Sequence, residues 1–201
     1  AASDVYKRQV KADSPYKTIE ELVAAAKEKG NLKASTNGNK ASNHTAAQLL
    51  AKSAGFKYKA IPYGGTADQL LALRQGEVDF TCAKVADVAK LVKGDKPELR
   101  VLAVFNTKRD PELPNVPTLG EKGLYPEWYG SARALVAPKG TKPEVIQYYV
   151  EAFKKTMQDP AVIEAHKKAG MALDFKDNKE LGDLIKAQDK FARDVVNDLY
   201  K

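Results

Sequence analysis

The sequence is poor in the residues that bind metals and form disulfides. It contains one cysteine, Cys82, and two histidines among its 201 residues. A single cysteine cannot form a disulfide within the chain, and no CxxC spacing exists for a metal or redox site. His44 and His166 fall on different expected helices and have no ligand spacing. We therefore expect no metal, no cofactor and a buried, inert Cys82 thiol.

Long apolar runs and isolated blocks of basic charge are also missing. No run of about 18 apolar residues could span a membrane. The net charge is +7, but the lysines alternate with acids along the chain. No aromatic and basic groove pattern accompanies them, so we expect a solvated basic surface and no nucleic-acid partner. With 43% hydrophobic residues, the chain has enough apolar surface for one domain or two small ones.

The first residues of the chain do not look like the start of a folded element. Residues 1–9 have no helix cap and no sustained hydrophobic period. Residues 4–9, DVYKRQ, resemble the translation of a sequencing-library adapter end. We expect residues 1–9 to be an artefact or a scar and leave them out of the predicted fold. We also expect that the chain lacks an upstream part of its protein, including any secretion signal.

Strands and helices alternate at short intervals over the first half of the chain. Thr18 and Glu21 form a capping box at the start of the first helix, and Thr66 to Gln69 form a second one. The alternation predicts a sheet with parallel pairs, with helices on both faces. The expected helices are 19–29, 45–54, 66–74 and 87–93, and the expected strands are 32–36, 57–62, 77–82 and 99–105.

Two glycine-containing turns each join an expected strand to an expected helix. The first turn is 37–42, with Ser42 or Asn43 as the cap of the following helix, and the second is 63–66. The first backbone N–H groups of a helix have no partner within the helix and carry partial positive charge, so such a turn can hold a carboxylate or phosphate. An ordinary loop is the alternative. In parallel sheets ligands bind beyond the carboxyl ends of the strands, where Cys82 also lies. The expected ligand contacts are Thr36, Asn37, Gly38, Ala41, Ser42, Tyr63, Gly65, Thr66 and Cys82.

The last third of the chain is rich in helices. Residues 128–137 predict a long strand, and Pro143 suits the first position of a helix. Further helices are expected at 144–158, 161–169 and from 180 to the end, with Asn178 as a cap and a short strand at 172–175. One or two strands cannot form a full sheet, so we expect these helices to need a further segment to cover them.

Several short motifs occur in a characteristic order over residues 10–201. This ordered set resembles the substrate-binding proteins of tripartite tricarboxylate transporters, the Bug-type receptors. At residues 40–41 and 64 the sequence departs from the Gly-Ser and lysine that are common in the family, which leaves the identity of the solute open. The motifs are Pro62–Thr66, Gly76–Asp79, Leu102–Val104, Arg109, Asn115–Thr118, Glu121–Gly123 and Ala137–Thr141.

The resemblance implies an α/β, two-lobed fold of the periplasmic-binding-protein type. One lobe has a complete mixed, mostly parallel sheet, and the other is represented only by its C-terminal helices. Residues 10–125 would be the second lobe, 126–137 a crossover strand and 138–201 the C-terminal part of the first lobe. The resemblance also implies a monomeric periplasmic receptor. It would capture a small carboxylated solute by hinge closure and deliver it to membrane permease subunits.

Two other classes of function are alternatives to a receptor. An enzyme would need a nucleophile and a base within hydrogen-bond reach, but Ser42 and His44 point in different directions on a helix. No GxSxG motif exists and Cys82 has no evident histidine partner, so we expect no catalytic residues. The effector-sensing domain of a transcription regulator has a similar two-lobed architecture. It would need a helix-turn-helix segment upstream.

Overall fold

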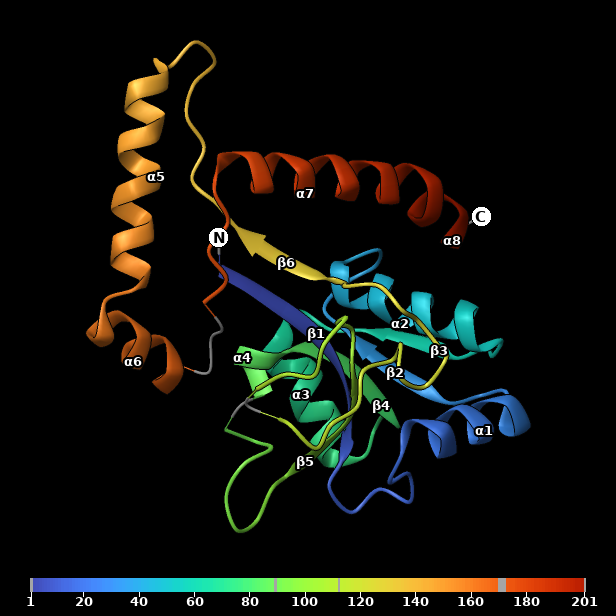
Figure 1. The fold of residues 1–201 in the computed structure, drawn as a ribbon. Helices are drawn as coiled ribbons and strands as arrows, with labels where there is room; N and C mark the ends of the chain where they lie inside the picture. The colour runs from blue at the N-terminus through green and yellow to red at the C-terminus, as the bar shows by residue number, and fades with distance from the viewer. Residues whose placement is uncertain (1, 89, 112, 170–172, 201) are drawn as a thin grey trace. The chain divides into compact units, whose positions relative to one another are not determined.

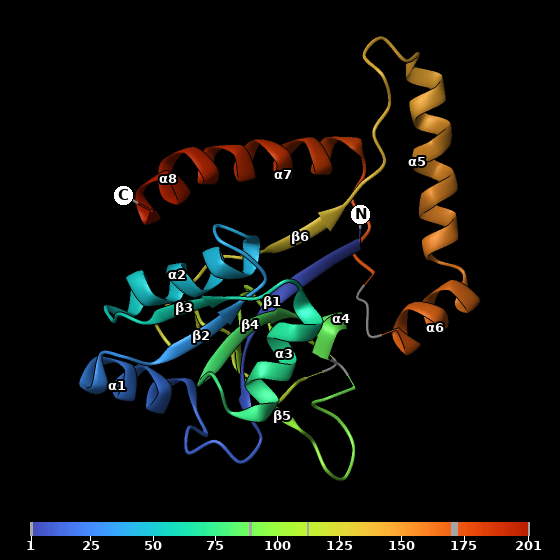
Figure 2. The ribbon, with the colours of Figure 1, turned by 180° about the vertical axis from the view of Figure 1, so that it is seen from behind.

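The computed structural model describes residues 2–88, 90–111, 113–169 and 173–200. The chain divides into two compact units. One consists of Val5–Gly130, and the other combines Ser131–Lys201 with the first four residues. Figure 1 shows the ribbon, and Figure 2 shows it from behind.

The larger unit is built on a mixed sheet with the strand order β3-β2-β4-β1-β5. Strand β2 is parallel to both β3 and β4, whereas β1 is antiparallel to both β4 and β5. The expected mixed sheet is therefore confirmed. The strands are β1 Ala2–Lys11, β2 Lys33–Thr36, β3 Lys59–Pro62, β4 Phe80–Lys84 and β5 Leu99–Val104.

The first residues form the strand β1, between β4 and β5 in the sheet (Figure 1). Lys7, Arg8 and Gln9 are fully buried there. The Lys7 ammonium lies 3.0 Å from the Asp110 carboxylate, and the Gln9 amide exchanges hydrogen bonds with the backbone of Ala83. Leaving residues 1–9 out of the fold was therefore wrong. Only its end, at residues 9–12, is indicated as a strand by the sequence, because the three consecutive polar residues give no alternation of apolar and polar positions.

Four helices pack around this sheet: α1 Ile19–Lys29, α2 Ser42–Ala54, α3 Thr66–Gln75 and α4 Val85–Val88. Helix α1 has the expected bounds, and the capping box of Thr18 with Glu21 is present. Its apolar face of Ile19, Leu22, Val23 and Ala26 is buried, as the helical period predicts.

The starts of α2 and α3 differ from the prediction. Ala41 is the N-cap of α2 and Gly65 that of α3, and neither has a side chain that bonds to the helix. The expected capping roles of Ser42, Asn43 and Thr66 are therefore wrong. Residues 43 and 66 lie inside the first turn of their helices. The first turns thus have no side-chain cap at the helix ends where we expect a ligand.

The smaller unit contains mostly helices. Strand β6, Gly130–Arg133, pairs with β1 and is shorter than the strand predicted for 128–137. The expected strand at 172–175 is absent from its described residues, 173–175, and Ala172 lies outside them. The other elements are α5 Pro143–Met157, α6 Pro160–Lys168, α7 Asn178–Phe191, the π-helical turn η1 Ala192–Val196 and α8 Asn197–Leu199.

Pro143 is the first residue of α5, as expected, but the cap of α7 is Asp177 rather than Asn178. Asp177 forms a capping box with Glu180, which the sequence also permits. None of the residues described in α5, α6 and α7 is buried. On α5, Tyr149 is 54% exposed and Phe153 is 41% exposed. An apolar stripe of this kind fits the expectation that another segment covers these helices.

Candidate functional site

The predicted turns meet at one edge of the sheet. Strands β2, β3 and β4 are parallel, so their carboxyl ends lie on the same side. The turn after β2 leads into α2, and the turn after β3 leads into α3. The Tyr63 N–H donates to the Thr36 carbonyl at 2.8 Å and ties the start of one turn to the start of the other. The sequence-predicted residues of both turns therefore come together in one region.

The first turn has an unusual backbone. Gly38 has a φ of 133° and Lys40 a φ of 58°, which is the only positive φ at a non-glycine residue among those described. The Lys40 N–H donates to His44 Nδ1 at 3.0 Å, and this bond holds the turn against the first turn of α2. A side chain rarely adopts the left-handed conformation of Lys40 unless its surroundings fix it. The turn is therefore a defined structure rather than a loose loop.

Two polar side-chain atoms at the end of β2 are buried and lack a hydrogen bond. They are Thr36 Oγ1 and Asn37 Oδ1, neither of which has a partner in the described part of the chain. Thr36 as a whole is 1% exposed. A buried polar atom without a partner costs about 1–3 kcal/mol, so its retention at a turn needs an explanation. Both atoms lie where the sequence predicts ligand contacts.

Ser42, next along the turn, bonds through its hydroxyl to the Tyr6 hydroxyl of β1. Its side chain therefore connects the turn to the sheet instead of capping α2. Thr45 donates from its backbone N–H to the carbonyl of the cap residue Ala41 at 2.9 Å, which marks the first regular bond of the helix.

The second turn leaves open space in front of α3. Gly65 has a φ of −176° and a ψ of 178°, which is extended backbone that any residue adopts. A Cβ added at Gly65 would meet nothing within 4 Å. The neighbouring Thr66 is the first residue of the helix. The glycine is thus required neither by its backbone angles nor by crowding within the chain.

The side chain of Tyr63 does not contribute to this turn. Its hydroxyl donates to the Glu77 carboxylate at 3.1 Å, and its ring packs against the apolar cluster around Leu73. Desolvation is the main cause that raises the pKa of the Tyr63 phenol, and the bond to Glu77 adds to it. The group of Tyr63 that lies at the turn is its backbone N–H, which is bonded to Thr36.

Cys82, a further predicted ligand contact, has a buried side chain. Its side chain is 1% exposed, and burial raises the pKa of its thiol to about 11. This confirms the expected buried, free cysteine. The Cys82 carbonyl, rather than its thiol, is the group that lies in a polar network, where it accepts a bond of 3.0 Å from Gln69 Nε2.

Sequence reasoning missed this polar network. The Asn43 side-chain amide donates to Gln69 Oε1 at 2.6 Å, and the Asn37 N–H donates to Asn43 Oδ1 at 3.3 Å. Asn43 is the second residue of α2 and Gln69 is the fourth residue of α3. Both therefore lie next to the two candidate anion turns, which precede these helices. The only signal in the sequence is a pair of amide side chains on helix positions that face the sheet.

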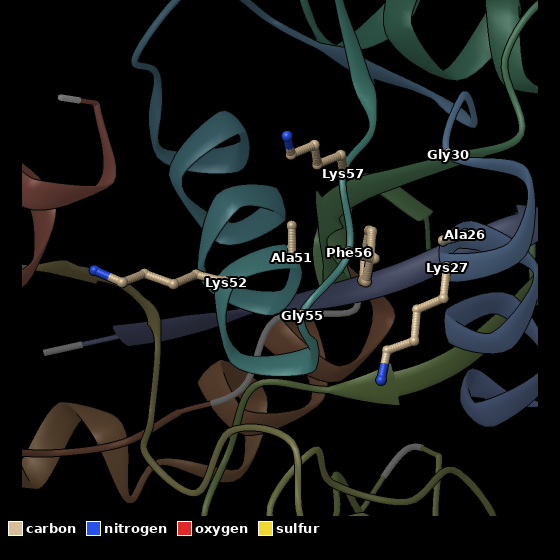
Figure 3. A pocket seen from close by; sticks show the side chains of 8 residues that line it. All are labelled: Ala26, Lys27, Gly30, Ala51, Lys52, Gly55, Phe56 and Lys57. Carbon is tan, nitrogen blue, oxygen red and sulfur yellow. The ribbon is translucent and has the colours of Figure 1, made fainter.

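A hollow of about 420 Å³ lies elsewhere on the larger unit (Figure 3). It is bordered by the C-terminal ends of α1 and α2, where Gly30 and Gly55 end these helices. These ends lead into the amino ends of β2 and β3, so the hollow is at the edge opposite to the turns. The side chains of its three lysines, Lys27, Lys52 and Lys57, point away from one another. They do not converge on a common point.

The described residues contain no group of three or more His, Cys, Asp and Glu side chains that could hold a metal ion. In the same residues, no helix has both the length and the apolar character needed to cross a lipid bilayer.

Comparison with known proteins gives consistent matches. The family model "Tripartite tricarboxylate transporter family receptor" matches residues 5–199. A protein of Cupriavidus necator, described as "UPF0065 protein in gbd 5′ region", is 38% identical over 152 residues, which are 75% of this chain and 45% of that protein. The chain spans about half the length of the curated relatives it matches.

Two solved structures are similar over nearly the whole chain. A TctC solute-binding protein from Polaromonas, without ligand, has a TM-score of 0.87 and 27% identity, over 98% of this chain and 67% of that one. The periplasmic binding protein BugD has a TM-score of 0.72 and 26% identity, over 96% of this chain and 67% of that one. The α/β, periplasmic-binding-protein-like fold that the sequence predicts is thereby confirmed.

Proposed function

The chain belongs to the tripartite tricarboxylate transporter receptor family, and we propose that it is part of a solute receptor that captures a small carboxylate and delivers it to a membrane permease. The observation that carries this proposal is the pair of turns at the carboxyl edge of the sheet. They are joined by the bond from Tyr63 N–H to the Thr36 carbonyl, and each opens a helix without a side-chain cap. Uncapped helix N-termini favour anions.

The proposed binding groups are mainly backbone N–H donors. The first turn would contribute Gly38 and Ser42, and the second Gly65 and Thr66, whereas the Ala41 N–H already donates to the Gly38 carbonyl at 3.4 Å. Such donors recognise a carboxylate oxygen without a charged side chain. The unbonded Thr36 hydroxyl and the Asn37 side chain are further polar groups at the same edge. We propose that Tyr63 and Cys82 support this site through their main chains, because their side chains are turned to Glu77 or buried.

We propose a two-lobed, monomeric receptor in the periplasm. Residues 10–125 would form the second lobe, residues 126–137 the crossover and residues 138–201 the C-terminal part of the first lobe. The exposed apolar stripe on α5 supports this division, because it needs a sheet to cover it. Hinge closure would follow from contacts that a solute makes with both lobes only in the closed state.

The arrangement of polar groups argues against the enzyme alternative. The Ser42 hydroxyl bonds to Tyr6, while His44 Nδ1 accepts from the Lys40 N–H, so the two side chains do not form a nucleophile and base pair. The family match and the two solved structures are receptors or binding proteins. None of them favours the effector-sensing domain of a regulator.

The proposal is tested with this chain and with a version in which the upstream segment of a relative is restored. A thermal-shift screen would use di- and tricarboxylates, aromatic acids and acidic amino acids, and calorimetry would measure the affinity of each hit for both versions. We expect tight binding only in the restored version, because each lobe supplies part of the hydrogen bonds. Equal affinity in both would contradict the two-lobed clamp. A restored version that binds none of these acids would contradict the function.

A further inference from the structure

The side chain of Gln69 uses every polar atom it has. It is 0% exposed, and its Oε1 accepts the 2.6 Å bond from Asn43 Nδ2. Its Nε2 donates to the Cys82 carbonyl at 3.0 Å and to the Thr81 hydroxyl. Gln69 therefore connects α3, on which it lies, to α2 and to β4.

The network continues through the strands. The Thr81 hydroxyl donates to the Ser35 carbonyl at 3.0 Å, and the Ser35 hydroxyl donates to the Gln69 carbonyl at 3.0 Å. Ser35 lies on β2 and Thr81 on β4, directly opposite each other in the ladder. The helix α3 is thus tied to both neighbouring parallel strands at the edge where the two turns begin.

The hydrogen bonds that run from the Asn37 N–H through Asn43 and Gln69 to the Cys82 carbonyl can each have only one direction. The Asn37 N–H can only donate, so Asn43 must present Oδ1 to it and its NH₂ group to Gln69. Gln69 must then present Oε1 to Asn43 and its NH₂ group to the Cys82 carbonyl, which can only accept. Neither amide can rotate by half a turn without placing two donors or two acceptors together.

Apolar side chains at positions 43 and 69 could fill the same space, but they would not fix the orientation of the groups around them as these hydrogen bonds do. We propose that Asn43 and Gln69 are positioning residues that hold the 37–42 turn at a fixed distance and angle from the N-terminus of α3. The two sets of backbone donors can then reach the same anion. This inference rests on the proposed function, because it concerns how that anion site is assembled.

The test uses this chain with sulfate as the probe, since sulfate is a small anion that needs no second lobe. Titration is followed by the amide shifts of residues 37–42 and 65–69 in nuclear magnetic resonance spectra. Unfolding in urea gives the stability of each variant. Gln69→Leu and Asn43→Leu are the single variants, and Gln69→Met retains the length of the side chain if Gln69→Leu fails to fold. Gln75→Leu is the control, because Gln75 is an exposed residue of the same helix.

The double variant Asn43→Leu/Gln69→Leu separates positioning from stability. Replacing both partners by apolar groups can restore stability that a single replacement loses. We expect the double variant to be more stable than the less stable of the two single variants. We also expect it to bind sulfate roughly ten-fold more weakly than the parent chain, because the backbone N–H groups that bond to the charged sulfate oxygens would be misplaced. The control should bind as the parent does.

Two results would overturn these ideas, and they differ. If the double variant or Gln69→Met binds sulfate as tightly as the parent, Gln69 does not position the turns, while the anion site itself stands. If the parent chain shows no saturable shift at either turn, the proposed anion site fails, and the inference fails with it.

Discussion

The guanidinium carbon of Arg8 lies 4.7 Å from the ring centroid of Phe80, and both side chains are fully buried. Arg8 Nε and Nη1 have no hydrogen-bond partner among the described residues, and Nη2 donates to the Ala46 carbonyl at 3.5 Å. Desolvation by burial lowers the pKa of Arg8. A contact between a cation and a ring compensates only part of such a loss of hydration.

Arg8→Met should therefore stabilise the protein. Removing a buried charge with unpaired donors, while keeping similar volume, should raise the free energy of unfolding by about 1–3 kcal/mol. Urea unfolding measures the change, and Arg133→Met, at an exposed position of β6, should change it by less than about 0.5 kcal/mol. An unchanged or lower stability of Arg8→Met would show that the guanidinium is well accommodated.

Gly65→Val should separate folding from anion binding. Because Gly65 has extended backbone angles and free space around its Cβ position, the substitution should leave the melting temperature nearly unchanged. The valine side chain would enter the space in front of α3 and weaken sulfate or carboxylate binding at least several-fold. Gly38→Val is the comparison, since a φ of 133° strains any other residue and should lower stability itself. Unchanged anion binding by Gly65→Val would place the site elsewhere.

His44 should make stability depend on pH below neutrality. Burial lowers the pKa of His44 from its ordinary value of 6.5, and its Nδ1 must stay unprotonated to accept the Lys40 N–H. The unfolded chain therefore takes up a proton at this position before the folded one does. His44 contributes its full stabilisation at pH values above the pKa that it has in the unfolded chain. This stabilisation is lost as the pH falls from that pKa through the lower pKa of the folded state.

His44→Gln should remove this part of the pH dependence. When the free energy of unfolding is measured at several pH values from about 7 down to about 5, it should decrease less for the variant than for the parent. His166→Gln, on α6, replaces the other histidine of the chain and is the matched control. The same slope in His44→Gln and the parent would mean that His44 takes up its proton equally in both states.

Cys82 should resist thiol reagents while the protein is folded. A thiol with a pKa of about 11 is almost entirely protonated near pH 8, and its side chain is 1% exposed. Ellman's reagent should therefore react only after denaturant is added, at a rate set by unfolding. Fast reaction of the native protein would show that β4 opens at its carboxyl end.

The sequence was informative wherever local chemistry decides the structure. Glycine and a capping box define α1, and Pro143 starts α5, because these signals act over one helix turn. The positions of the two glycine-containing turns are also confirmed, since a glycine-containing stretch between a strand and a helix is a local pattern. Their joining by the bond from Tyr63 to Thr36 follows from the parallel pairing of β2 with β3.

Features that depend on distant partners were missed. The sequence predicts Gln69 as the last residue of a capping box, but its bonds go to Asn43 on another helix and to Thr81 and Cys82 on a strand. The bond of the Tyr63 hydroxyl to Glu77 joins residues 14 positions apart, and no local pattern in the sequence indicates it. A single sequence gives the distance between such residues along the chain but not in space.

The position of β1 in the sheet has a consequence for how the chain folds during synthesis. Lys7 pairs with Ala83 on one side and with Val104 on the other, so neither partner strand exists when β1 leaves the ribosome. Pairings this far apart in sequence slow folding, because a long loop must close first. Once β4 has been made, β1 can pair with it, but until β5 has been made β1 has an open edge on its other side. Nascent chains are therefore most exposed to mispairing with one another in that interval, and a chaperone that binds extended segments would act there.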